Sequence, residues 1–294
     1  MVLAPDKVHC ELGMPPPLPS PSRGRRWQYA LIGLLTMVGL VLGVMATGVV
    51  RYELRSHPGA KSVSSAVSSF RHSGSSSLDP LHAVPAAGVY TLRGQGGERI
   101  SFPPNSQKDG ATMPATVTHL SNGCWRWHLD YNAAHAEEYV FCPTEAGLTQ
   151  STNVNIQHWD YGAFKVSNIA IMTCPAGSVV LPSAPSTGQK LTWSCSETST
   201  AISGLSQSTT KAHIVGVEPL RIGSATVETA HEVQETTLSG TQTGTVTENW
   251  WFDVTNGLPV RIDREIMVHT ASPLGAITYT ESGSWQMASL TPHT

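Results

Sequence analysis

The sequence has few charged residues. Asp, Glu, Lys and Arg make up 13% of its 294 residues, against about 25% in an average globular chain. The formal net charge is −3. A domain that binds nucleic acid needs a basic face, and the sequence shows none. Nucleic acid is therefore excluded as a predicted partner.

Catalytic motifs are also lacking. There is no Gly-x-Ser-x-Gly elbow and no Walker loop. Residues 94–97 (Gly-Gln-Gly-Gly) lack the third glycine and the helix of a dinucleotide site, and residues 231–235 (His-Glu-Val-Gln-Glu) end one residue short of His-Glu-x-x-His. Residues 208–211 fit Ser-x-x-Lys, a pattern common by chance. The sequence therefore predicts no enzyme, no catalytic residue, no metal and no cofactor.

One long apolar run is present near the N-terminus. Residues 28–50 read QYALIGLLTMVGLVLGVMATGVV and contain no charge. About 20 apolar residues span a bilayer, whereas the apolar region of a cleavable signal peptide has roughly 7–15. Trp27 and Tyr29 suit an interfacial aromatic belt. We predict a single transmembrane helix, with cleavage after the Val-Met-Ala triplet at 44–46 as the alternative.

The orientation of this span depends on the cysteines. Basic residues flank both sides nearly equally, so the positive-inside rule does not decide. Four of the five cysteines follow the span, and disulfides form outside the cytosol. We therefore predict a single-pass protein of the cell membrane, with a cytoplasmic N-terminus and an extracytoplasmic C-terminal domain. Cys10 lies alone in the short N-terminal tail.

Composition divides the rest of the chain into three parts. Residues 1–26 are a cytoplasmic tail containing Pro and Arg. Residues 51–84 are rich in Ser and poor in large apolar side chains, so we predict a flexible stalk. Residues 85–294 are long enough to bury a sizeable core and are predicted to form the extracytoplasmic β domain.

The pattern of the C-terminal domain is β. Alternating apolar and polar residues, rich in β-branched and aromatic types, are separated by Gly, Pro, Asn and Ser. No helical stripe appears beyond the predicted span, so we expect an antiparallel curved sheet, a half-barrel or a sandwich. The predicted strands are 88–93, 98–102, 115–120, 124–130, 137–142, 148–156, 164–172, 190–195, 212–220, 224–238, 245–254, 258–269 and 276–287.

Residues 122–143 read NGCWRWHLDYNAAHAEEYVFCP and predict a hairpin with a disulfide at its base. If Cys124 faces Cys142, then His128 faces Glu138 across the strands. Arg126, His128 and Asp130 share one face, and the aromatic residues share the other. The alternative is a metal site built from His128, Asp130, His135, Glu137 and Glu138, but its spacing matches no tight Cys/His zinc pattern.

Cys174 and Cys195 form the second candidate disulfide. A loop rich in Pro, Gly and Ser separates them and leads into a strand. A bond between them would hold this loop against its neighbour. Because four cysteines allow three pairings, another connectivity stays open.

The C-terminal hairpin carries a family resemblance. Residues 247–266 read TENWWFDVTNGLPVRIDREI, a strand, an Asn-Gly turn and a second strand. Alternation places Trp250 and Phe252 on one face and Trp251 and Asp253 on the other. This motif, together with the Gly-Cys…Phe-Cys-Pro hairpin, resembles uncharacterised single-pass membrane-anchored proteins of actinobacteria. The hairpin also resembles that of the LolA-like lipoprotein carriers, which implies a curved sheet around a cavity that holds acyl chains.

Three functions stay open from the sequence. The first is a tethered domain that binds a lipid or another apolar ligand of the cell envelope. The second is a structural or protein-interaction module of the envelope, and the third is an enzyme in which His128, Glu138 and His158 converge. For the first, the residues predicted to face the ligand are Trp125, Trp127, His128, His158, Trp159, Trp250 and Phe252.

Overall fold

The computed structural model describes residues 58–73, 84–272 and 275–294. The chain divides into two units, Met1–Val50 and Arg51–Thr294, and every described residue belongs to the second. The predicted tail and the predicted span at 28–50 lie outside the described residues. None of the helices within those residues is long and apolar enough to cross a membrane.

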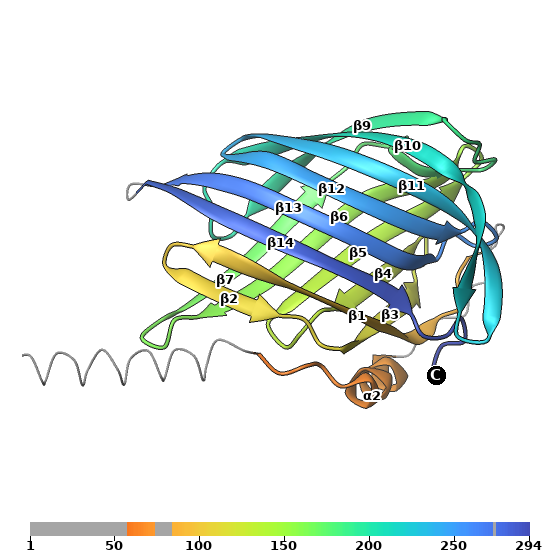
Figure 1. Cartoon of the computed structure of the whole chain (residues 1–294), viewed down its shortest axis with the longest axis horizontal. Helices are drawn as coiled ribbons and strands as arrows, with labels where there is room; N and C mark the ends of the chain where they lie inside the picture. Colours follow the sequence, from red (N-terminus) through yellow and green to blue (C-terminus); the bar gives the residue numbers. More distant parts are fainter. Residues whose placement is uncertain (1–57, 74–83, 273–274) are drawn as a thin grey trace, which may run out of the picture. The chain divides into compact units, whose positions relative to one another are not determined.

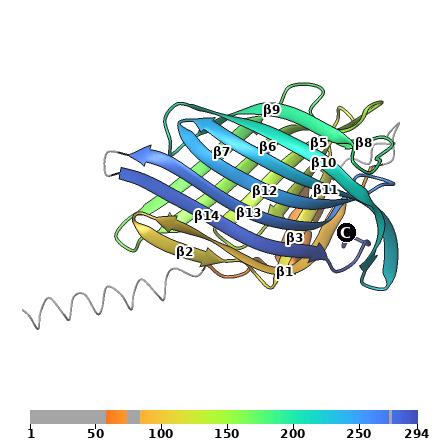
Figure 2. The same ribbon diagram turned by 45° about the horizontal axis from the view of Figure 1, so that its top comes forward.

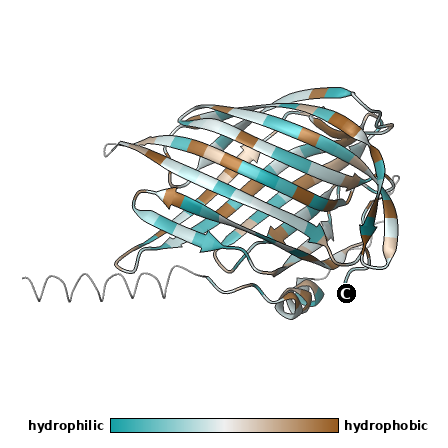
Figure 3. Cartoon of the chain, viewed as in Figure 1, coloured by the Kyte–Doolittle hydropathy of each residue, from teal (hydrophilic) through white to brown (hydrophobic). Residues whose placement is uncertain are grey.

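The described part of Arg51–Thr294 is mainly β, as predicted, with one helix, α2 (Val63–Ser73). Hydrophilic and hydrophobic residues alternate along many of the strands (Figure 3), which is what the period of two predicts. The strands are β1 (Gly88–Ser101), β2 (Pro104–Lys108), β3 (Thr112–His119), β4 (Trp125–Asp130), β5 (His135–Thr144), β6 (Gly147–Asp160), β7 (Lys165–Thr173), β8 (Val179–Pro182), β9 (Lys190–Ser199), β10 (Leu205–Ile222), β11 (Ala225–Gly240), β12 (Gln242–Asp253), β13 (Pro259–Ser272) and β14 (Gly275–Met287).

The sheet closes into a barrel, so the prediction of an open curved sheet, half-barrel or sandwich is wrong in this respect. The last strand, β14, pairs with both β13 and β1, and all pairings are antiparallel. Twelve of the fourteen strands form the ring, while β2 lies against β1 and β8 against β6. Figures 1 and 2 show the ring from two directions. Closure leaves no long unpaired edge along the ring.

Glycines at the seam between β1 and β14 explain the closure. A Cβ on Gly94 would lie 2.1 Å from the carbonyl oxygen of Ser284, and one on Gly283 would lie 2.0 Å from the ring of Trp285. Because Gly94 and Gly283 carry no side chain, β1 and β14 can pair closely and the Trp285 indole can lie against them. The glycine run at 94–97, which is too short for a dinucleotide motif, belongs to this seam.

Both predicted disulfides are present. Cys124 bonds to Cys142, and Cys174 bonds to Cys195. The β4–β5 register places His128 opposite Glu138, as the hairpin prediction requires. A disulfide that closes a short loop contributes roughly 2–4 kcal/mol in the chain-entropy model.

Three local predictions are wrong. Ranges 88–93 and 98–102 form one continuous strand, β1, and the short strands β2 and β8 were not predicted. Within the predicted stalk, residues 63–73 form α2, although no helix was expected after the span. This helix is held by tertiary contacts: Phe70 is buried, and Arg71 donates to the carbonyl oxygen of Thr294 at 3.0 Å. Contacts of this kind override the weak helix propensity of a Ser-rich segment.

The apolar core fills one end of the barrel interior. Trp127 packs against Tyr139 and Trp250, with ring centroids 5.8 and 6.1 Å away. Trp250 and Phe252 point inward and Trp251 outward, as predicted. Trp251 donates to Glu218 at 2.8 Å and lies 4.4 Å beneath the guanidinium of Arg261. We call this filled end the closed end.

Candidate functional site: a cavity at the open end of the barrel

The other end of the interior is hollow, with a cavity of about 400 Å³. Turns between strands form its mouth, which we call the open end. Phe102 in the β1–β2 turn, Tyr161 in the β6–β7 turn and Ile202 in the β9–β10 turn all line it. Phe102 is 47% exposed, so the cavity reaches the surface there. Cavities of roughly 300–1,000 Å³ are typical of small-molecule sites.

The order of side chains along the strands separates the two ends. On β13, Ile262 belongs to the core, Arg264 follows, and Ile266 and Val268 line the cavity. On the neighbouring strand β12, Trp250, Glu248 and Val246 follow the same order. Successive inward residues of one strand therefore lie in three different environments, namely the core, the charged layer and the cavity.

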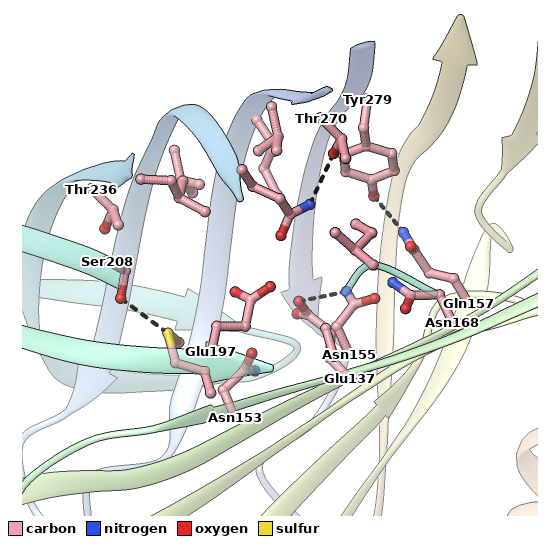
Figure 4. A pocket seen from close by; sticks show the side chains of 18 of the residues that line it. Glu137, Asn153, Asn155, Gln157, Asn168, Glu197, Ser208, Thr236, Thr270 and Tyr279 are labelled. Atoms are coloured by element: carbon pink, nitrogen blue, oxygen red, sulfur yellow. Dashed lines mark hydrogen bonds between the residues drawn. The ribbon is translucent and has the colours of Figure 1, made fainter. Parts of the chain in front are cut away.

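The cavity wall combines apolar surface with carboxamides. Trp159, Trp193 and Met172 lie on the β6–β7–β9 wall, and Val246 and Ile266 lie across from them. Between them, amide and hydroxyl groups point into the space (Figure 4). These polar residues are Gln150, Asn153, Asn155, Gln157, Asn168, Gln234, Gln242, Ser208, Thr210, Thr236, Thr270 and Tyr279.

Arg264 forms the floor of the cavity, and its side chain is 1% exposed. Its guanidinium lies 2.6 Å from Glu248, 2.8 Å from Glu137 and 3.1 Å from Glu281. It also donates to the hydroxyls of Tyr131 at 3.0 Å and Tyr139 at 2.6 Å. We call these six residues the Arg264 layer. Charge-assisted bonds of this length explain how a buried cation is tolerated.

The acids of the Arg264 layer differ in their pKa. Burial by itself raises the pKa of Glu137, but the charges of Arg264 and His135, together with hydrogen bonds from Arg264 and Tyr139, outweigh burial and lower the pKa to about 2. For Glu248 burial outweighs Arg264, and its pKa is raised. Glu137 is therefore the ionised partner of Arg264, and the layer holds no positive charge in excess.

Beside this layer, Glu98, His135 and Glu281 place ligand atoms within 4.8 Å of one another. The Asn155 amide nitrogen lies 3.1 Å from His135 Nε2 and donates to Glu137 at 3.1 Å. With Asn155 as the donor, Nε2 accepts and the proton of a neutral ring sits on Nδ1, 3.6 Å from Glu98. A metal needs that nitrogen unprotonated, so this cluster fits a shared proton better than a metal ion.

Two of the residues predicted to face a ligand line the cavity, Trp159 and Trp250. Three others point inward but are packed in the closed end: Trp125, Trp127 and Phe252. The two histidines lie on the outer surface, because each occupies the opposite phase of its strand. His128 contacts Asp130 at 3.2 Å and Glu138 at 3.5 Å, and His158 contacts Ser167 at 2.9 Å. His128, Glu138 and His158 therefore do not converge inside the barrel.

The sequence prediction missed the polar part of the site. Arg264 and Glu248 each sit in phase with apolar neighbours on an alternating strand, as Arg264 does between Ile262 and Ile266. A charge in such a stripe signals a buried ion pair. That signal was present in the sequence, but it does not say which strands bring the charges together.

Comparisons with known proteins do not identify a family for the chain. No protein-family model matches the chain, and no curated protein matches it. Among solved structures, the chain is similar to the hypothetical lipoprotein YmcC of Escherichia coli (K12), with 15% identity and a TM-score of 0.35, covering 74% of this chain and 95% of that one. A likeness this low carries no argument about function, so the resemblances drawn from the C-terminal hairpin stay predictions.

Proposed function

We propose that the barrel binds an amphipathic, lipid-like ligand in its open end and is a binding module without catalytic activity. The observation that carries the proposal is the cavity of about 400 Å³, open at the mouth and lined by aromatic, aliphatic and carboxamide side chains. Mostly apolar walls with a few polar groups are typical of sites that hold small organic molecules. Anchoring at the cell membrane, with the barrel outside the cytosol, is part of this proposal.

The barrel offers a preformed wall for such a ligand. Closure through β1 and β14 and the Cys174–Cys195 disulfide hold the strands around the cavity. A preformed site loses less conformational entropy on binding than a flexible one. An apolar ligand therefore gains most of its binding free energy from leaving water, at about 25 cal/mol per Å².

The test is to purify the full chain in nanodiscs made of one synthetic lipid, extract it with organic solvent and analyse the extract by mass spectrometry. Ala170 lines the cavity wall on β7, while Ile169 beside it is 38% exposed outside. We expect about one equivalent of a non-nanodisc amphiphile from the wild type and from Ile169→Phe, and much less from Ala170→Phe. Release of nothing, together with no binding of added alkyl probes, would reject the proposal.

A protein-interaction module of the envelope is the second candidate. Ile169 and Ile171 on the outer face of β7 are 38% and 42% exposed, and Phe164 in the adjacent turn is 51% exposed. Such a row of apolar side chains is typical of a docking surface. Loss of a co-purifying protein in Ile171→Ser, with the extract unchanged, would support this function.

A further inference from the structure

The charges in the cavity are unbalanced toward the negative. The charged lining residues are Glu137, Glu197, Glu248 and Arg264. Arg264 is the one cation among the described lining residues, and its guanidinium is already bonded to carboxylates and tyrosine hydroxyls of the Arg264 layer. An anionic group entering the cavity would therefore meet carboxylates and no unoccupied cation.

Glu197 is the carboxylate that remains open to a ligand. It lies on β9, lines the cavity and is half-buried. Among the described residues, no hydrogen bond or ion pair joins its carboxyl group to another side chain. Figure 4 shows this group projecting into the open space near Asn153 and Ser208, with no interaction drawn to it.

The surroundings of Glu197 supply acceptors and neutral donors. Burial raises the pKa of its carboxyl, and no neighbouring cation offsets that effect. Asn153 on β6 and Ser208 on β10 offer an amide and a hydroxyl group near it, which bind hydroxyls and amines without selecting for charge. Met172, which pairs with Glu197 across the β7–β9 ladder, supplies apolar surface beside it.

We propose that the ligand is an amphiphile whose polar group donates hydrogen bonds and carries no negative charge, an alcohol or an amine, and that Glu197 accepts from this group. The inference rests on the proposed function, since it concerns the same cavity. It excludes fatty acids and other simple anionic lipids from the preferred ligands. The reason is that burying a second carboxylate beside Glu197 without a cation costs free energy that the chain burial must offset.

The experiment compares three probes with identical bromoalkyl chains that end in an alcohol, an amine or a carboxylate. Bromine quenches tryptophan at short range, and Trp159, Trp193 and Trp250 line the cavity. Quenching of the full chain in nanodiscs is measured against Ala170→Phe, which corrects for probe that enters the bilayer. We expect the alcohol and the amine to bind at least ~10-fold more tightly than the carboxylate.

Two variants test whether Glu197 causes the preference for the alcohol and the amine over the carboxylate. Glu197→Gln should bring the carboxylate to within ~3-fold of the alcohol, while Glu235→Gln, on the exposed face of β11, should change nothing. If all three probes bind equally, or the carboxylate binds best, the inference is overturned and the proposed function stands. If no probe quenches the wild type more than Ala170→Phe, the proposed function itself fails.

Discussion

The two ends of this barrel are built from the same strands but differ in what fills them. At the closed end, indole and phenyl rings meet across the axis, as Trp127 does with Trp250 and Phe141 with Phe252. At the open end, the inward positions carry residues such as Asn153, Thr236 and Val246, which line a cavity. Rings from several strands meet at the closed end, whereas at the open end the rings of Trp159 and Trp193 on one wall face shorter side chains across the cavity. The size of alternate residues therefore decides whether a barrel of this width is solid or hollow.

The Arg264 layer separates the two ends, and removing its cation should give the largest effect. Arg264→Met leaves Glu137, Glu248 and Glu281 without their buried cation, which costs about 3–5 kcal/mol of unfolding free energy. Chemical denaturation measures this loss. The matched control is Arg261→Met on the outer phase of β13, with a loss within about 1 kcal/mol. Equal losses for both would contradict the description of the layer.

A pair of tryptophans tests the contrast between the ends directly. Trp127 is fully buried in the core, so Trp127→Ala should cost about 3–5 kcal/mol. Trp193 borders empty space, and Trp193→Ala should cost about 1–3 kcal/mol, because part of its surface has no packing partner. The two unfolding free energies, measured by denaturant titration, should differ by about 2 kcal/mol. Similar costs would mean that the open end is packed as tightly as the closed one.

Much of the closed end was predictable from the sequence. The cysteine spacing gave the β4–β5 register and both disulfides, and alternation gave the inward phase of Trp250 and Phe252. These features depend on neighbouring residues in one hairpin. A period of two and a turn are enough to specify them.

The open end and the closure were not predictable in the same way. Pairing of β1 with β14 joins residues 193 positions apart, such as Arg93 and Gln286, and no local pattern indicates it. The cavity depends on which side chains from distant strands share one level of the barrel. Alternation identified Trp125 and Trp127 as inward residues, but it cannot tell a filled level from a hollow one.

On the outer surface of the barrel, His128 should make the free energy of unfolding depend on pH. Burial alone lowers its pKa, but Asp130 and Glu138 outweigh burial and raise it to about 9. Because its pKa is higher in the folded state, the protonated His128 ring stabilises the fold fully below about pH 6.5. This stabilisation of about 2 kcal/mol is lost as the pH rises through about 9. His128→Asn should flatten the curve in that window, whereas the wild type should lose stability across it. A wild-type curve that is already flat would exclude this role.

The smallest effect is expected at Glu232, an inward residue between the two ends. Its side chain is fully buried, Oε1 accepts from Gln234 at 2.9 Å, and Oε2 has no hydrogen bond. Burial raises its pKa well above the usual value, so the wild type loses stability as the pH rises above about 4.3. Glu232→Gln should be about 1 kcal/mol more stable at pH 7 and equal to the wild type at pH 4. If the variant and the wild type differ in stability by the same amount at pH 4 and at pH 7, the buried charge of Glu232 is not the cause.

The central claim, that the open end is a ligand cavity and the closed end is not, has one direct measurement. Crystals of the protein grown with the bromoalkyl alcohol would locate the bromine by anomalous scattering. We predict one ordered bromine site inside the barrel, among Trp159, Trp193 and Met172. Bromine found only on the outer surface, or among Trp125, Trp127 and Phe252, would contradict the account.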